Sequence, residues 1–394
     1  MKLKDAIEFN PTEKISKNII AKKVGMEKLS PFYKYITGYN YEKYSGGAKF
    51  RNGDTLVARI TPCLENGKTA YVNILEDNEI GFGSTEFIVM RNKENVTIPE
   101  YVYYLAISEK FRDKSISLMT GTSGRQRVQI DPLKEEEFDI PSISNQKKSV
   151  KILSKIDNKI KLNNEINNNL LQLCRYKYDE LNKKYDDWDL VKINDLNLEV
   201  TDYVANGSFK SLADNVTLYD EKEYALYVRN TDLKVNFTDK RKYVDQKSYE
   251  FLKKSKLKGG ELIISNVGDV GSVFICPHLN IPMTLGSNVI MLYETDNHYY
   301  NYFLYFFFTS VYGQYMIDGI TGGSAQPKFN KTDFRNMEIK FPALDELDRF
   351  NAEIDPIYKK YELNIKENEK LSELRDTLLP KLMNGEIDLD NIEI

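Results

Sequence analysis

Polar, glycine-rich loops carry the side chains that could do chemistry in this chain of 394 residues. One set has Arg59 and Lys68 in a first loop, and Arg125, Gln126 and Arg127 in a second. A later set consists of Asn266, Ser324, Gln326 and Lys328. Arg and Gln can form paired hydrogen bonds with base edges, whereas Lys, Ser and backbone amides suit phosphates. The side chains therefore predict contacts with nucleic acid. The alternative is that both sets are ordinary strand-connecting turns. For the glycines we favour this alternative, because a turn needs residues that can adopt a positive φ.

Residues of the types used in metal binding and nucleophilic catalysis are few and scattered. His278 follows a proline in an expected turn, and neither it nor His298 has a carboxylate or cysteine pattern nearby. Cys63, Cys174 and Cys276 are odd in number and far apart in the sequence. We therefore expect no disulfide framework and no metal site, as is usual in a reducing compartment.

Two further patterns were weighed as enzyme motifs. Residues 81–83, Gly-Phe-Gly, could form a methyl-donor or nucleotide loop, but they precede a strand, whereas a phosphate-binding loop opens a helix. Asp318 with Glu338 and Lys340 has the residue types of a metal-dependent nuclease. The matching residues 137–139 lack the lysine, and both segments alternate like edge strands. The sequence thus predicts a protein that is not an enzyme.

Composition sets broad limits on the function. The chain is 41% apolar and 29% charged, which is typical of a folded protein. Its most apolar stretch, residues 299–308, is too short to span a membrane and is expected to be a buried helix. The first residues lack the apolar core of a secretory signal, so we expect a cytoplasmic protein without a membrane partner. A net charge of −4 is unusual for a protein that binds nucleic acid. Binding depends on the electrostatic potential at the contact surface, so a local basic face can still bind DNA.

An internal repeat organises the chain. A shift of about 201 residues aligns Thr120 with Thr321 and Pro141 with Pro342, and the alignment continues without a gap through a helical stretch. Upstream, residues 52–57 resemble residues 259–264, and Gly83-Ser84 resembles Gly286-Ser287, each followed by a strand-like run. Each half therefore reads as a strand-rich module followed by a long helix.

Each predicted helix has a seam of apolar residues at alternating spacings of three and four, with asparagines at matching positions. This spacing is typical of a coiled coil, in which seam asparagines fix the register at some cost in stability. The residues expected to pair the helices are Ile156, Ile160, Asn163, Asn167, Leu170, Ile357, Tyr361, Asn364, Asn368 and Leu371. Lys177 and Arg375 interrupt the seams. Asp355-Pro356 looks like a start or kink of the second helix, and Gly385 like its end.

Charge supports pairing of the two helices with each other. Residues 142–185 carry ten Lys or Arg against four Asp or Glu, whereas residues 343–384 carry seven against ten. The simplest arrangement is an antiparallel pair with one module at each end, about 60 Å long for helices of about 40 residues. The alternative is two separate helices, each packed on its own module.

Taken together, the motifs resemble the specificity subunits of type I restriction–modification systems. Residues 53–68 are similar to a frequent first-module motif of that family, and residues 120–124 and 321–324 to the loop that closes each module. Pro141 followed by Gln146 resembles the start of its central helical region, and residues 374–387 its C-terminal end. The resemblance covers essentially the whole chain. One departure is that Leu347 stands where a second glutamine would match Gln146.

The resemblance implies an α+β fold with an internal pseudo-twofold repeat, in which two strand-rich target-recognition domains are separated by two long antiparallel coiled-coil helices. Its segments would be residues 1–141 (first domain), 142–186 (central helical spacer), 187–342 (second domain) and 343–394 (C-terminal helical spacer). Each domain would read one half of a bipartite site in double-stranded DNA.

The resemblance also implies partners. The helices would set the gap between the half-sites and dock two methyltransferase subunits, which would carry S-adenosylmethionine, so that this chain itself needs no cofactor. Restriction and translocase subunits would complete the complex. Two other hypotheses stay open: a coiled-coil adaptor that joins proteins without reading DNA, and an enzyme whose site is assembled between the modules.

Overall fold

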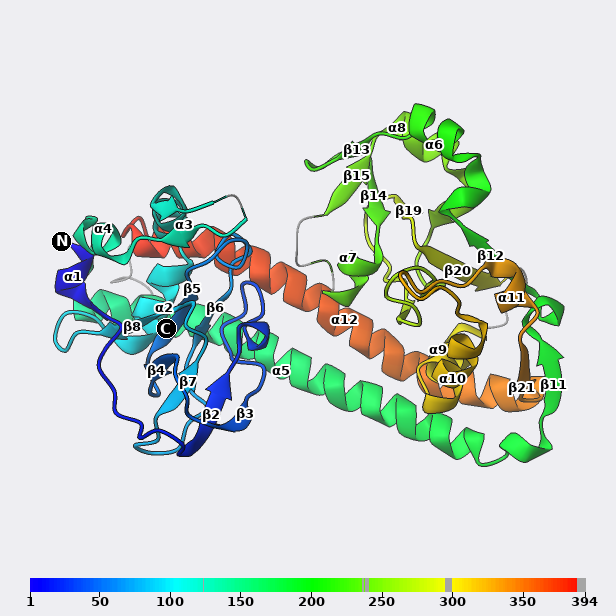
Figure 1. The fold of residues 1–394 in the computed structure, drawn as a ribbon, viewed down its shortest axis with the longest axis horizontal. Coiled ribbons are helices and arrows are strands. Elements are labelled where there is room, and N and C mark those ends of the chain that lie inside the picture. Colours follow the sequence, from blue (N-terminus) through cyan, green and yellow to red (C-terminus); the bar gives the residue numbers. More distant parts are fainter. Residues whose placement is uncertain (123, 236, 238–240, 295–299, 388–394) are drawn as a thin grey trace. The chain divides into compact units, whose positions relative to one another are not determined.

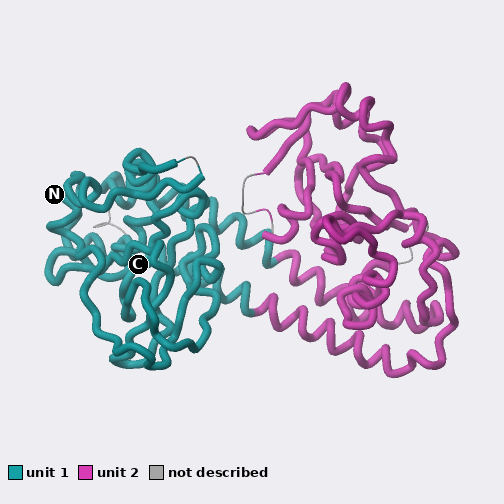
Figure 2. Tube along the Cα trace, viewed as in Figure 1, with its two compact units in different colours: residues 1–165, 364–394 teal, residues 166–363 magenta. Residues whose placement is uncertain are grey.

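The structure is a computed structural model that describes every residue except 123, 236, 238–240, 295–299 and 388–394. The chain divides into two compact units, of which the first is assembled from two separate stretches of sequence and the second from one continuous stretch (Figure 2). Unit 1 comprises residues 1–165 and 364–394, and unit 2 comprises residues 166–363. No helix in the described part of the chain is both long and apolar enough to cross a membrane.

Two long helices, α5 (Ile143–Asn182) and α12 (Leu344–Met383), each contribute to both units (Figure 1). A start of α12 at Asp355-Pro356 is wrong, because the helix begins at Leu344 and runs through the proline, whereas a kink at this place stays a prediction. Pro356 is exposed, while Phe350 and Ile354 are buried on the other side of the helix. Packing along this face therefore outweighs the hydrogen bond that the proline ring removes.

The end of α12 is where the sequence predicted it. Gly385 has φ +70, and the Glu386 amide donates to the Lys381 carbonyl at 2.9 Å, while the Asn384 amide donates to Pro380 at the same distance. A left-handed glycine with these bonds closes a helix by satisfying its last carbonyls.

Unit 1 contains two four-stranded sheets. The first has the order β1 (Ile7–Phe9), β8 (Phe87–Asn92), β5 (Thr55–Ala58), β6 (Thr69–Tyr71) and is antiparallel throughout. The second has the order β3 (Asn40–Lys43), β2 (Ile20–Val24), β7 (Gly81–Gly83), β4 (Ala48–Phe50), with β2 and β7 parallel. The remaining elements are α1 (Leu3–Ala6), η1 (Met26–Lys28), α2 (Pro99–Ile107), α3 (Glu109–Ser117), the hairpin β9 (Met119–Thr120) with β10 (Arg127–Val128), and α4 (Ile130–Glu135).

Unit 2 repeats this plan. Its first sheet has the order β12 (Leu198–Asp202), β20 (Val289–Glu294), β17 (Leu262–Ser265), β18 (Val273–Ile275). Its second has the order β13 (Leu218–Tyr219), β15 (Lys242–Val244), β14 (Ala225–Val228), β19 (Met283–Leu285), β16 (Lys256–Leu257), with β14 and β19 parallel. The helices are α6 (Phe209–Asn215), α7 (Asn230–Lys234), α8 (Gln246–Phe251), α9 (Tyr300–Phe308), α10 (Val311–Ile320) and α11 (Lys331–Arg335). A pair of strands, β11 (Asp189–Lys192) and β21 (Glu338–Phe341), and the turns η2 (Tyr185–Asp187), η3 (Ile193–Asp195), η4 (Tyr203–Asn206) and η5 (Lys253–Ser255) complete the unit.

The shared strand order confirms the repeat. In both units the chain's second strand of the first sheet, β5 or β17, lies next to the last strand, β8 or β20. Helix α9 confirms the prediction of a buried helix in residues 299–308, although Tyr299 lies outside the described residues. The predicted segment boundaries at residues 141, 186 and 342 stay a prediction.

The hydrophobic core of each unit contains helix residues from the other half of the sequence. In unit 1, Leu379, Leu382 and Met383 of α12 are buried with α2 and with the first sheet. In unit 2, Cys174 and Tyr178 of α5 are buried with the aromatic helix α9. The core of unit 1 therefore needs a segment from the far end of the sequence, whereas the core of unit 2 is built from one continuous stretch that begins within α5.

Gln146 ties the start of α5 to the first module. Its side chain is fully buried, accepts from the Ile98 amide at 2.9 Å, and donates to the carbonyls of Val96 at 2.8 Å and Pro141 at 2.9 Å. The matching Leu347 is instead buried in the hydrophobic cluster of unit 2. At these matched positions, hydrogen bonds therefore attach the first module to its helix, whereas apolar packing attaches the second.

We expect Gln146→Ala to lower the free energy of unfolding of unit 1 by about 1–3 kcal/mol, because three backbone groups lose a buried partner. Urea unfolding followed by circular dichroism measures the loss. Fluorescence of Trp188, which is the single tryptophan and is buried in unit 2, gives an internal reference. Gln172→Ala, at an exposed position of the same helix, is the control. Equal transitions for the two variants would contradict the prediction.

Candidate nucleic-acid interface

In unit 1 the structure brings together the two loops that carry the predicted site residues. The Thr61 amide donates to the Gln126 carbonyl at 3.0 Å, and the Val128 amide donates to the Arg59 carbonyl at 2.9 Å. The hairpin β9–β10 is thereby joined to the loop that follows β5. Because β5 is buried along its whole length, packing of this strand holds the first residue of the loop in place.

Arg127 is held by an ion pair. Its guanidinium donates to both carboxylate oxygens of Glu86, with the shortest contact at 2.7 Å, and both side chains remain partly exposed. The Arg127 guanidinium lowers the pKa of the Glu86 carboxyl through this hydrogen bond, and Glu86 in turn raises the pKa of Arg127. The pair orients Arg127 at the base of the hairpin, where an incoming phosphate would compete with Glu86 for it.

The other predicted residues of unit 1 differ in accessibility. Arg125, at the tip of the hairpin, is exposed, while Gln126 is half-buried; Ser123 lies outside the described residues. Lys68 donates to the Met26 carbonyl at 3.0 Å, and Arg59 contacts the Val128 carbonyl at 3.5 Å. Arg125 is therefore the residue of this set that is best placed to reach a ligand.

Unit 2 has the equivalent arrangement with different side chains. Gly322 and Lys328 exchange backbone hydrogen bonds at 2.9 and 2.8 Å and close the loop. The Phe329 amide donates to the Asn266 carbonyl at 3.1 Å, which joins this loop to the segment after β17. The Asn266 amide group donates to the Phe329 carbonyl at 3.3 Å. The exposed members of the set are Ser324, Gln326 and Lys328.

Asp269 anchors the loop after β17 in unit 2. Its carboxylate pairs with Lys234 at 2.5 Å and accepts from Ser272 at 2.6 Å and from Asn230 at 3.0 Å. These bonds, led by the one from Lys234, lower the pKa of Asp269 to about 2. Asp269 thereby ties the loop to α7. Neither Asp269 nor Glu86 could be singled out from the sequence, because their basic partners, Lys234 and Arg127, are distant in the chain.

The helices pair antiparallel within each unit. In unit 1 the Asn163 side chain donates to Glu367 and Asn368 at 2.9 Å, and Asn368 donates to Asn164 at 2.9 Å. In unit 2 the Asn167 side chain donates to the Tyr361 carbonyl at 3.3 Å. Ile156, Ile160, Asn163, Asn167 and Asn364 are buried, whereas Leu170, Ile357, Tyr361, Asn368 and Leu371 are half-buried.

Ion pairs cross between the helices with the polarity that the charge counts predicted. Lys159 meets Glu367 at 3.3 Å in unit 1, and in unit 2 Lys177 meets Glu353 at 2.6 Å. The alternative of two separate helices is therefore wrong. Both interruptions of the seam, Lys177 and Arg375, have an acidic partner on the opposite helix, and the partner of Arg375 is the buried Asp157.

The residues weighed for catalysis are found in structural roles. Residues 81–83 form the buried strand β7, so they do not open a helix. Lys340 donates to the Asp186 carbonyl at 2.7 Å from β21, a strand of a two-stranded sheet, while Asp318 lies in α10. The three cysteines are free, and His298 lies outside the described residues. Among the described residues, none of the histidines, cysteines and acids form a group that could hold a metal ion.

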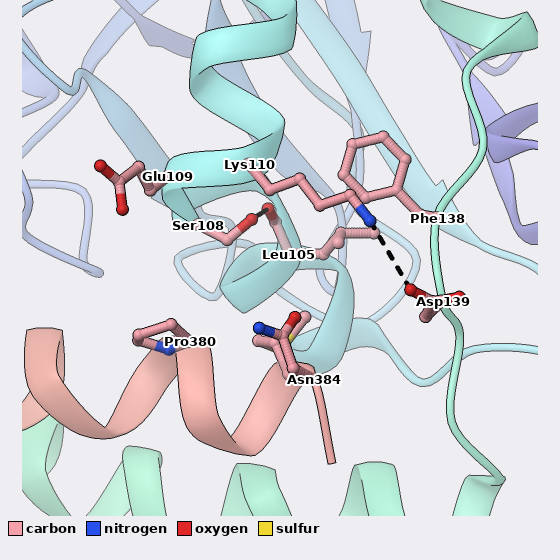
Figure 3. A pocket seen from close by; sticks show the side chains of 9 residues that line it. Leu105, Ser108, Glu109, Lys110, Phe138, Asp139, Pro380 and Asn384 are labelled. Atoms are coloured by element: carbon pink, nitrogen blue, oxygen red, sulfur yellow. Dashed lines mark hydrogen bonds and ion pairs between the residues drawn. The ribbon is translucent and has the colours of Figure 1, made fainter. Parts of the chain in front are cut away.

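A small cavity of about 150 Å³ lies in unit 1 between the α2–α3 junction, Phe138 and the end of α12 (Figure 3). Lys110 and Asp139 pair across its rim at 3.6 Å, while Leu105, Pro380 and Met383 give it an apolar lining. Its lining contains none of the predicted loop residues, and the hydroxyl of Ser108 in this lining donates to the Leu105 carbonyl at 2.7 Å. It adds no catalytic site to the interface.

Comparison with known proteins identifies the family. The model of the type I restriction modification DNA specificity domain matches residues 1–172 and again residues 185–373, one match for each half of the repeat. The chain belongs to this family. Members recognise DNA sequence as the non-catalytic specificity component of type I restriction–modification systems, so this chain is a DNA-recognition subunit and not itself an enzyme.

Relatives and solved structures agree with this assignment. The HindI specificity subunit of Haemophilus influenzae is 21% identical over 88% of this chain and 90% of the relative. The MjaIX specificity subunit of Methanocaldococcus jannaschii is 24% identical over 75% of this chain and 70% of the relative. The crystal structure of a type I S subunit from M. genitalium superimposes with a TM-score of 0.51 at 16% identity, covering 97% of this chain and 95% of that one. The α+β fold of strand-rich modules separated by long helices is therefore that of the family.

Proposed function

We propose that each unit of this specificity subunit reads one half of a split, asymmetric DNA site through its closing loop and the loop that follows β5 or β17. The observation that supports this most directly is the equivalent backbone framework with different side chains. The closing loop carries Arg125, Gln126 and Arg127 in unit 1, but Ser324, Gln326 and Lys328 in unit 2. Two different sets of donors suit two different half-sites.

The helices α5 and α12 are proposed to dock two methyltransferase subunits, which would bring S-adenosylmethionine and the chemistry. The support is a duplicated set of exposed apolar side chains at positions matched by the repeat. Leu162 and Leu363 are 51% and 60% exposed, and Leu173 and Leu374 are 43% and 47% exposed. Leucines exposed at matched positions suit two copies of one partner. The seam would set the gap between half-sites, and restriction and translocase subunits would add cleavage.

Co-expression with the methyltransferase of the same system, followed by mapping of adenine methylation across a host genome, tests the proposal. We expect one split motif with a fixed gap. Replacing residues 1–141 by the corresponding module of another subunit should change one half of the motif and leave the other half and the gap unchanged. If a stable complex forms without any new motif, the protein is a coiled-coil adaptor and the proposed readout is wrong.

Within that assay we expect Arg125→Ala to weaken or relax one half of the motif, with a loss of about 1–3 kcal/mol in DNA binding if the guanidinium contacts a base. DNA binding by the purified complex, measured over a range of salt concentrations, distinguishes a contact with a base from a contact with a phosphate. A phosphate contact would instead lower the salt slope by about one for all sequences. Lys381→Ala, at an exposed position of α12 away from the loops, is the charge-matched control. The same effect from both variants would argue against a specific role for Arg125.

Replacement of Leu162 and Leu363 by lysine should weaken methyltransferase docking at two equivalent places, because each substitution puts a charge into an apolar contact. Analytical ultracentrifugation of the complex is expected to give one bound methyltransferase for either single variant and none for the double variant. Gln172→Lys, an exposed polar position of α5, is the control and should leave two bound. If the double variant still binds two methyltransferase subunits, the proposed docking at Leu162 and Leu363 is wrong.

A further inference from the structure

A buried ion pair joins the two long helices in unit 1. Arg375 of α12 and Asp157 of α5 are each 2% exposed, and their side chains meet at 3.2 Å. Tyr104 donates to Asp157 at 2.6 Å, and Arg375 donates to the Phe32 carbonyl at 2.8 Å. Burial acts to lower the pKa of Arg375, but Asp157 raises it above its ordinary value, so the guanidinium stays charged.

The repeat places uncharged residues at the two corresponding positions. A shift of 201 residues takes Asp157 to Tyr358, and it takes Cys174 to Arg375. Cys174 and Tyr358 are 1% and 8% exposed and belong to the hydrophobic core of unit 2. The seam asparagines behave differently, since Asn163 corresponds to Asn364 and Asn167 to Asn368. The middle of the seam therefore has the same residue types in the two halves, whereas the positions of Asp157 and Arg375 do not.

We propose that the Asp157–Arg375 pair makes the seam select an unlike partner, so that α5 pairs with α12 and neither helix pairs with a second copy of itself. In a self-pair of α5, Asp157 would face Cys174 of the second copy. In a self-pair of α12, Arg375 would face Tyr358 of the second copy. A self-pair of α5 buries two Asp157 carboxylates without an arginine partner, and a self-pair of α12 buries two Arg375 side chains whose only remaining acidic contact among the described residues is the exposed Asp376 of the same helix, at 3.0 Å. Burying a charge without its buried partner costs far more than a well-formed buried ion pair contributes.

The exposed charges favour the same choice. In the three ion pairs Lys159–Glu367, Lys177–Glu353 and Lys184–Glu346, α5 or the turn after it supplies the cation and α12 the anion. Residues 142–185 carry ten basic and four acidic side chains, so two copies of this segment would repel each other. Because these pairs are partly exposed, each is worth little, and the buried pair dominates.

One consequence rests on the function proposed above. Selective pairing ensures that every helix pair carries two different modules. A self-paired half would present the same module twice and would read a symmetric site. The pairing rule itself concerns only the helices, so it is tested without DNA and can fail or succeed independently of the proposed readout.

The test uses the full chain with a protease site inserted after Lys184, an exposed residue in the turn between α5 and η2. The protein folds first and is then cleaved, so that residues 1–184 and 185–394 remain together without a covalent link. Urea just below the unfolding midpoint lets the fragments exchange, and mixing with a ¹⁵N-labelled copy verifies the exchange. Native mass spectrometry then distinguishes the unlike pair from the two self-pairs by mass.

For the natural sequence we expect unlike pairs, with self-pairs at no more than about one part in a hundred, as the cost of an unpaired buried charge implies. Asp157→Tyr combined with Arg375→Cys gives both places in the seam the same residues and should raise self-pairs at least tenfold. Asp157→Asn with Arg375→Met removes the charges with little change in volume, should have the same effect, and covers the case in which the tyrosine does not fit. Self-pairs that are abundant in the natural sequence, or equally rare in a folded variant without the charges, would overturn the proposal.

Discussion

Leu379, Leu382 and Met383 lie near the end of the described chain, yet they are buried among strands and helices built from the first 140 or so residues. In unit 2, Cys174 and Tyr178 of α5 and Leu347 and Phe350 of α12 enter the core from the two ends of one continuous stretch, so that each long helix packs in both cores. This reciprocal packing is the constraint on which the rest of the structure depends. It makes α5 and α12 part of both cores, fixes their antiparallel direction within each unit, and leaves the loops free to vary. Burial of these apolar side chains is the main favourable contribution to folding, and the exposed closing loops take little part in it.

Much of this architecture could be predicted from the sequence because the repeat and the seam are periodic. The shift of the repeat located β5 against β17 and the closing loops against each other, and charge counts gave the pairing of the helices. The spacer predicted from residue 343 agrees with the start of α12 at Leu344, but Asp355-Pro356 does not begin a helix. An Asp-Pro pair is a local signal, whereas the buried face on either side of Pro356 comes from tertiary packing. Local propensity is a weak guide where a long apolar face is buried.

The candidate site was predictable in its backbone but not in its contacts. The closing loops were found because glycines and polar residues recur at matched positions. The sequence could not reveal that Glu86 neutralises Arg127 or that Lys68 is bonded to Met26, because each pair lies about 40 positions apart and is joined only by the fold. Arg375 was seen as an interruption of the seam, since neither Cys174 nor Tyr358 hints at an acidic partner in the other half.

The reciprocal packing also has a consequence for biosynthesis. The first module leaves the ribosome long before the segment around Leu382 that closes its core, with roughly 200 residues still to be made. At about 5–20 residues per second, the apolar faces of α2 and of the start of α5 stay uncovered for on the order of tens of seconds. Synthesis of the segment around Leu382 is therefore the step that completes the core of the module made first.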